Sequence, residues 1–164
     1  MHLQGSCHCQ AVRFSLESDH PYPFNLCYCS ICRKTAGGGG FAINLSGRAD
    51  TMVVEGREHL RVYRALVQRE GETEAKRSSG ERNFCGLCGS ALWLWSARWP
   101  ELIHPHASAI DTPLPRPPER THLLVDSRAS WVDLHADPQD RIFAGYPDES
   151  IAQWHERLGL VEQE

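Results

Sequence analysis

The stretch Cys85-Gly86-Leu87-Cys88-Gly89 has the form of a zinc knuckle, in which two cysteines lie close together on a tight turn. Glycine permits the positive φ values that such a turn can require, and it lets backbone N–H groups approach the sulfurs. A tetrahedral thiolate site is typically built from two knuckles that come from distant parts of a chain. Cys7-His8-Cys9 is a plausible second knuckle. We therefore expect one closed structural zinc site made of Cys7, Cys9, Cys85 and Cys88.

The other three of the seven cysteines are Cys27, Cys29 and Cys32. An odd count and close pairs argue against a disulfide framework. Three thiolates leave one coordination position open, and an open position distinguishes a catalytic zinc from a structural one. Two alternatives remain at this point. One cysteine of the three could be a buried spectator while the others belong to the first site, or a histidine could close a second structural site, the candidates being His8, His104 and His106.

Composition and charge argue against a nucleic-acid-binding protein and against a membrane protein. The 164 residues fit one domain spanning 1–164, and the formal charge of -4 offers no basic excess for nucleic acid. The longest apolar run, 91–95, is far short of the about 20 residues that span a bilayer, and the start MHLQGSCHCQ has no apolar signal-peptide core. We expect a cytoplasmic protein that binds neither nucleic acid nor membrane, with an oligomeric state that the sequence leaves open.

Short strand-like runs between Gly and Pro clusters predict a mainly β fold of several small sheets cross-linked by zinc. The predicted strands are 11–16, 41–45, 52–55, 60–64, 74–79, 91–95, 122–125 and 131–133. A single helical turn is expected over 30–35, with Ser30 as its N-cap. Ile151, Trp154 and Leu158 have helical spacing, and Gly159 is a stop signal, so a short C-terminal helix is also expected.

The ordered pattern resembles the glutathione-dependent formaldehyde-activating family, also called the GFA or CENP-V/GFA domain. The matching segments are Gly5-Ser6-Cys7-His8-Cys9, Cys27-Tyr28-Cys29-Ser30-Ile31-Cys32-Arg33-Lys34, Phe84-Cys85-Gly86-Leu87-Cys88-Gly89-Ser90, Ala129-Ser130-Trp131 and Gly145-Tyr146-Pro147. The resemblance implies an Mss4-like fold of small twisted antiparallel sheets. It also implies two zincs per chain, with Cys7, Cys9, Cys85 and Cys88 as ligands of a structural zinc and Cys27, Cys29 and Cys32 as ligands of a catalytic zinc.

The family reaction joins a thiol, glutathione, to a small aldehyde, formaldehyde, and is formally a carbon-sulfur lyase reaction run in reverse. The resemblance therefore implies an enzyme acting on a thiol and an aldehyde or on their adduct. The alternative is a zinc-stabilised binding module without catalysis. One departure concerns Tyr28, which stands where the family often has histidine. Arg33, Lys34 and the glycines 37–40 could contact a ligand, or they could be solvated charge and a flexible loop.

Overall fold

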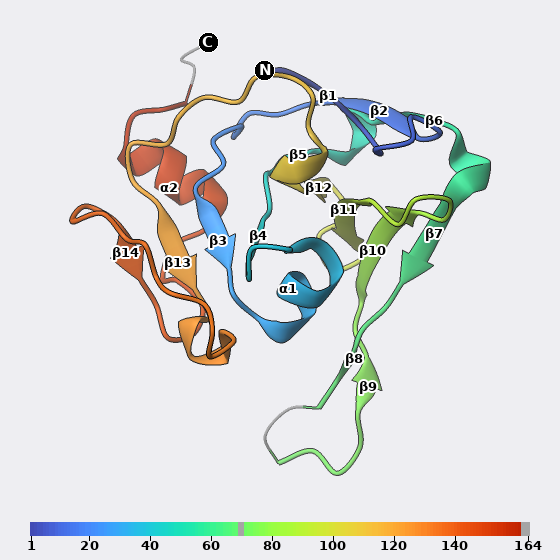
Figure 1. Ribbon diagram of the computed structural model, residues 1–164. Coiled ribbons are helices and arrows are strands. Elements are labelled where there is room, and N and C mark those ends of the chain that lie inside the picture. Colours follow the sequence, from blue (N-terminus) through green and yellow to red (C-terminus); the bar gives the residue numbers. More distant parts are fainter. Residues whose placement is uncertain (69–70, 162–164) are drawn as a thin grey trace.

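The computed structural model describes residues 1–68 and 71–161 (Figure 1). Its strands form four small sheets. The three-stranded sheet has the order β1 (His2–Ser6), β2 (Arg13–Glu17), β6 (Val53–Glu55). The five-stranded sheet has the order β5 (Gly47–Arg48), β12 (Leu102–Pro105), β11 (Ala91–Ser96), β10 (Gly80–Cys85), β7 (Leu60–Tyr63).

The third sheet has four strands in the order β14 (Arg141–Ile142), β13 (Thr121–Leu123), β3 (Asn25–Cys27), β4 (Ala42–Ile43). The fourth is a two-stranded ribbon, β8 (Leu66–Val67) and β9 (Lys76–Arg77), which projects from the body of the molecule in Figure 1. The predicted fold class, mainly β with several small sheets and a short C-terminal helix, is confirmed.

The third sheet departs from the antiparallel pairing that was expected. Strand β13 pairs in parallel with both β3 and β14, whereas β3 and β4 are antiparallel. A parallel pair needs a long crossover connection, and here the 93 residues 28–120, which include α1, β4 and strands of the other sheets, separate the end of β3 from the start of β13. Local patterning could not show this pairing, because the two partners lie far apart in sequence.

The largest hydrophobic core lies among the strands of the three-stranded and five-stranded sheets. Phe14 on β2 meets Trp93 on β11 edge to face, with ring centroids 5.2 Å apart. Two of the cysteines, Cys7 and Cys85, are fully buried in this same core. The packing of apolar side chains thus brings two cysteines together that are distant in sequence.

The C-terminal helix α2 (Ile151–Arg157) begins and ends as the sequence indicates. Ser150 and Gln153 form a capping box, which satisfies two backbone N–H groups at the helix start. Gly159, at φ 65°, follows the last turn in the left-handed conformation that glycine adopts readily. Trp154 is fully buried and stacks on Phe24, with ring centroids 3.7 Å apart. His155 of the same helix is also fully buried and meets Tyr22 and Phe24 edge to face, so the helix is docked through Trp154 and His155.

We expect Trp154→Ala to lower the free energy of unfolding by about 3–5 kcal/mol, because it leaves a large cavity against Phe24. Denaturant titration followed by circular dichroism measures the change. Trp131→Ala is the matched control, since Trp131 is 66% exposed and its truncation should change stability by less than about 0.5 kcal/mol. Equal effects of the two substitutions would contradict this docking.

Two local predictions are wrong. Residues 131–133 do not form a strand: the N–H of Val132 donates to Ala129 O at 3.0 Å in a turn, and Val132 packs on Leu26 and Tyr28. The strand predicted over 122–125 ends at Leu123, since Leu124 adopts φ 57° and the chain turns there. No helix among residues 1–68 and 71–161 has the length and apolar character needed to cross a bilayer.

Candidate metal centres

The first sulfur cluster joins the turn after β1 to the end of β10. Sulfurs of Cys7 and Cys9 lie 3.5 Å apart, and those of Cys9 and Cys85 lie 3.9 Å apart. With Cys88, all four sulfurs lie within 4.8 Å of one another. A tetrahedral zinc with bonds of 2.3 Å separates its sulfurs by about 3.8 Å. The cluster therefore fits a zinc ion, and all its cysteines are free thiols.

Backbone and hydroxyl groups around this cluster form hydrogen bonds with the sulfurs, as is usual around the ligands of a metal site. The N–H of Val12 donates to Cys7 Sγ at 3.3 Å, and Gln10 takes a left-handed φ of 63° to close that turn. Ser90 Oγ lies 3.2 Å from Cys88 Sγ. Hydrogen bonds from the Ser90 hydroxyl and backbone lower the pKa of Cys88 to about 5. Its thiolate is thus available at neutral pH.

The second cluster lies at the junction of β3 and the helix α1 (Ser30–Ala36). Cys27 is the last residue of β3, and Cys29 is the N-cap of α1, its sulfur accepting from the N–H of Cys32 at 3.3 Å. The N-cap is therefore Cys29 and not Ser30, which is the first helical residue. The three sulfurs lie within 4.8 Å of one another, so this cluster could also hold a metal ion.

Neither the spectator-cysteine alternative nor the histidine-ligand alternative is supported. Within 1–68 and 71–161, the two sulfur groups are separate and contain no histidine, aspartate or glutamate. His104 Nδ1 instead lies 2.9 Å from the carbonyl oxygen of Leu45. His106, the residue directly after β12, is buried. The three sulfurs of Cys27, Cys29 and Cys32 thus have no fourth protein ligand of these types in the described chain.

Protons are shared unequally among the three thiols. Hydrogen bonds from Cys27 and Cys32 lower the pKa of Cys29 to about 2, against the opposing effect of burial. The pKa of Cys27 is raised, chiefly because it donates to Cys29. Cys29 is therefore the first thiolate of the group, and a cation arriving there would meet an ionised sulfur.

Two further side chains, Arg82 and Tyr146, lie beside the second cluster. Arg82 on β10 directs Nη2 toward Cys32 Sγ at 3.9 Å. The N–H of Leu124 donates to Gly145 O at 2.8 Å, which fixes the backbone just before Tyr146, a side chain that is 78% exposed. Desolvation, and then the negative charge of Cys27, Cys29 and Cys32, raises the pKa of Tyr146. The sequence analysis did not select these residues as site residues, although Tyr146 belongs to the quoted Gly145-Tyr146-Pro147 motif.

Comparison with known proteins identifies the family. The model of the family described as "Glutathione-dependent formaldehyde-activating enzyme" matches residues 2–127. The chain belongs to the GFA family. It is 64% identical to a Halomonas elongata protein named "Putative glutathione-dependent formaldehyde-activating enzyme", over 99% of both chains. A crystal structure of a Rhodobacter sphaeroides protein is similar with a TM-score of 0.51 and 25% identity, covering 68% of this chain and 91% of that one.

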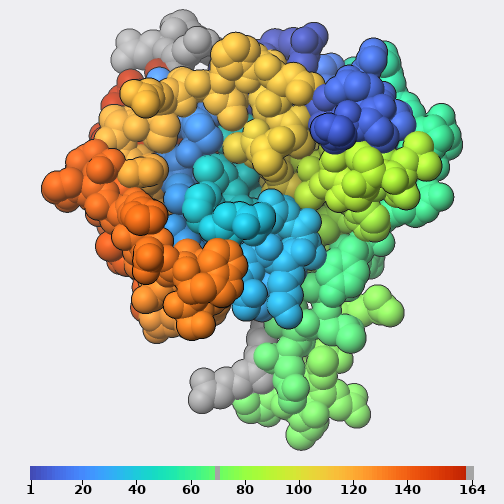
Figure 2. Space-filling view, in the orientation of Figure 1, coloured from blue at the N-terminus to red at the C-terminus, as the bar shows by residue number. Residues whose placement is uncertain are grey.

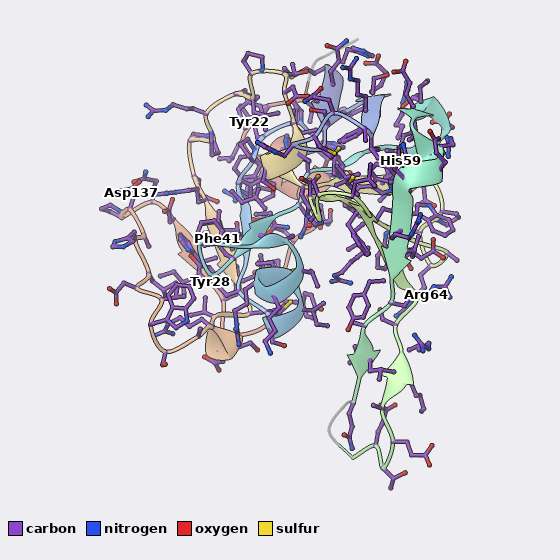
Figure 3. The ribbon with its side chains drawn as sticks, turned by 45° about the vertical axis from the view of Figure 1, so that its right-hand side comes forward. Tyr22, Tyr28, Phe41, His59, Arg64 and Asp137 are labelled. Atoms are coloured by element: carbon purple, nitrogen blue, oxygen red, sulfur yellow. The ribbon has the colours of Figure 1, made fainter. Side chains whose placement is uncertain are left out.

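The Tyr28 side chain of this GFA protein packs in a different hydrophobic cluster from Cys27 and Cys32. It packs on Leu26 and Val132 and beside Phe41, with ring centroids 5.4 Å apart (Figure 3). Its hydroxyl lies 2.9 Å from His122 Nδ1. Burial is the main cause that raises the pKa of the phenol. Tyr28 is therefore a packed residue in a hydrogen-bonded chain and is badly placed to exchange protons at the sulfurs.

The series of hydrogen bonds that begins at Tyr28 continues from His122 to Asp140. His122 Nε2 lies 3.4 Å from Asp140 Oδ2, and because a carboxylate only accepts, His122 donates there and accepts from Tyr28 through Nδ1. Both His122 and Asp140 are about 1% exposed. Asp140 also accepts from the backbone N–H and the Nε of Arg120. These hydrogen bonds connect Tyr28, which lies between Cys27 and Cys29, to His122 on β13 and to Asp140 just before β14.

We expect Tyr28→Phe to lower the free energy of unfolding by about 1–3 kcal/mol, because it leaves a buried His122 nitrogen unpaired. Turnover of thiol and aldehyde should change by less than about twofold, a bound that follows from a side chain that does not touch the reacting groups. Thermal denaturation and steady-state kinetics test the two parts separately. A large loss of turnover with unchanged stability would show that the phenol takes part in the chemistry.

Proposed function

We propose that this GFA protein catalyses the addition of a thiol to a small aldehyde, glutathione and formaldehyde being the substrates that the family description indicates. The observation that carries the proposal is the group of three sulfurs within 4.8 Å of one another with no fourth Cys, His, Asp or Glu ligand in the described chain. In the reaction the thiol sulfur forms a bond to the carbonyl carbon, the carbon–oxygen π bond opens, and the oxygen takes up a proton. The thiol proton is released, so no oxidant or reductant is needed. The reverse direction is a carbon-sulfur lyase reaction.

Cys27, Cys29 and Cys32 are proposed as the ligands of a catalytic zinc, and Cys7, Cys9, Cys85 and Cys88 as those of a structural zinc. A zinc ion in the three-sulfur site would supply a positive charge that lowers the pKa of an incoming thiol to below neutrality. Cys27, Cys29 and Cys32 would hold the ion and leave one coordination position for the thiol. Reduced sulfurs are required for both sites, which suits the reducing conditions of the cytoplasm.

In this proposal Arg82 offsets negative charge at the sulfurs, and Tyr146 donates a hydrogen bond to the aldehyde. Three thiolates give the site a net negative charge even with a divalent cation bound, and the Arg82 guanidinium near Cys32 offsets part of it. Tyr146, whose pKa is raised, keeps its phenolic proton at neutral pH. It can donate a hydrogen bond to the aldehyde oxygen as negative charge develops there.

The test uses the zinc-loaded protein with glutathione and formaldehyde. Because the adduct also forms without a catalyst, the measurement is the exchange rate between free and adduct formaldehyde, followed by NMR at equilibrium. We expect exchange faster than in buffer, with the increase proportional to protein concentration. Exchange at the buffer rate, in protein carrying two zincs, would favour the non-catalytic binding module instead.

A further inference from the structure

Strand β7 is an edge strand of the five-stranded sheet, and β8 continues it into the projecting ribbon. Residues 60–67 pair on one side only, β7 with β10 and β8 with β9. In the part of the chain that the structure describes, no strand pairs with their other side. His59 and Arg64 lie just beyond the two ends of β7 in Figure 3, and Figure 2 shows the green atoms of the ribbon standing clear below the body of the molecule. This side of the strand is therefore a free sheet edge.

The backbone groups along this edge alternate in direction. The carbonyl oxygens of His59 and Ala65 each accept a backbone N–H from the opposite arm of the same hairpin, at 2.8 Å. Since successive residues of an antiparallel strand face opposite sides, odd-numbered residues face that arm. The N–H and C=O groups of Val62, Arg64 and Leu66 therefore point outward, where another strand could pair with them.

The charged side chains of this edge are turned back onto their own chain. Natural edge strands are commonly protected from pairing by charged side chains. Here Arg61 Nη1 donates to Glu58 O at 3.0 Å and to Leu60 O at 2.7 Å, and Arg64 forms an ion pair with Glu81. The apolar side chains are instead exposed, Val62 by 52%, Tyr63 by 46% and Leu66 by 60%. An edge of this kind is suited to pairing with a further strand.

We infer that this edge pairs antiparallel with the same edge of a second copy of the chain, about a two-fold axis at Tyr63. In an antiparallel pair, residues that point outward lie opposite residues that point outward. With Tyr63 opposite Tyr63 of the partner subunit, Val62 lies opposite the partner's Arg64. In the same register, Leu60 lies opposite the partner's Leu66. The strand is thus complementary to itself, because no two like charges face each other and the exposed leucine of the ribbon gains an apolar neighbour.

Neighbouring positions of the axis are less favourable. An axis at Arg64 would place the two Arg64 side chains directly opposite each other, and like charges in that position are destabilising. An axis at Val62 would place Leu66 opposite the partner's Glu58, so that an exposed apolar side chain would meet a carboxylate. The charge pattern therefore selects the axis at Tyr63.

This pairing would join two five-stranded sheets into one continuous sheet across the axis. About eight residues of each copy would pair, which gives an interface well below the standard size of about 1,600 Å². We therefore expect a weak dimer with a Kd of about 10 μM. The inference does not depend on the proposed reaction, since no sulfur or substrate group takes part in the pairing.

The sign of a charge introduced at Val62 tests this register. Val62→Lys places an ammonium group opposite the partner's Arg64, whereas Val62→Glu places a carboxylate there. Sedimentation velocity of the zinc-loaded protein at increasing concentration measures the Kd of the dimer. We expect Val62→Lys to raise this Kd at least about tenfold over Val62→Glu, because two such cross-strand pairs form in each dimer. Val53→Lys is the control, since Val53 is 60% exposed on the edge strand β6, and it should change the Kd by less than about twofold.

Hydrogen exchange of the wild-type protein adds a test that needs no variant. The amides of Val62 and Arg64 point outward, so we expect them to exchange at least about threefold more slowly at about 500 μM than at about 1 μM, where the chain is mostly monomeric. The amide of Tyr63 faces β10 and should exchange equally at both concentrations. Residue-resolved mass spectrometry measures these rates.

Three results would overturn the inference. A wild-type chain that stays monomeric up to about 500 μM would leave the edge for a strand of a different protein. Equal dimer Kd values for the two Val62 variants would show that the copies meet in another register or on another surface. Exchange at Val62 and Arg64 that does not depend on concentration would show that this edge is unpaired in the dimer.

Discussion

Replacing Cys85 by serine is expected to unfold the protein. Cys85 is fully buried in the largest core, and its sulfur is one of the four of the first cluster. A structural zinc supplies about 10–16 kcal/mol of apparent binding free energy, and the total stability of a domain is about 5–15 kcal/mol. Loss of zinc from this site therefore removes an amount of free energy comparable to the whole stability of the fold. Far-ultraviolet circular dichroism and a thermal scan should show no cooperative transition for Cys85→Ser.

Leu87→Ser is the control in the same knuckle. Leu87 lies between Cys85 and Cys88 but is 65% exposed, so its substitution should leave the melting temperature within a few degrees of the wild type. If Cys85→Ser unfolded cooperatively at the wild-type temperature, the first cluster would have no structural role.

Replacing Cys29 by serine is expected to separate activity from folding. Serine is a good N-cap, so its hydroxyl can take over the hydrogen bond from the N–H of Cys32 and α1 should remain intact. The three-sulfur site, however, loses a ligand. Metal-ion stabilisation of a transition state is worth several kcal/mol, so turnover of glutathione and formaldehyde should fall by about 10³-fold.

Ser30→Ala is the companion variant, because Ser30 is exposed and begins the same helix without belonging to the sulfur cluster. It should keep wild-type turnover and melting temperature. Wild-type turnover in folded Cys29→Ser would remove the three-sulfur group from the mechanism, whatever the state of the first cluster.

The cysteine grouping could be predicted because ligand spacing is a local property. Cys85 and Cys88 lie three residues apart, and Cys27, Cys29 and Cys32 lie within six residues at the junction of β3 and α1; the structure brings together the two sulfur groups that the sequence analysis expected. The terminal helix was equally local, since its apolar spacing and Gly159 stop signal lie within ten residues. The assignment of one cluster as structural and the other as catalytic stays a prediction.

Features that depend on long-range packing were missed. Strand β10 has a polar sequence, Gly80-Glu81-Arg82-Asn83-Phe84-Cys85, and is a strand because it lies between β7 and β11 in the sheet. Strand β3 shows no alternation long enough to read, and the strand predicted over 122–125 overlaps β13 but carries no sign of its parallel partner. Arg82 reaches Cys32 from β10, and nothing in one sequence ranks it above other charged residues, whereas Tyr146 stood in a quoted motif without being selected as a site residue.

Native mass spectrometry of the purified wild-type protein and of Cys29→Ser tests the central claim most directly, because it counts zinc ions on each folded chain. The seven sulfurs are expected to hold two zincs in the wild type, one in a closed four-sulfur site and one in an open three-sulfur site. We therefore predict masses with two zincs for the wild type and one for the variant. A folded wild-type chain carrying a single zinc, or a variant that retains two, would contradict the account.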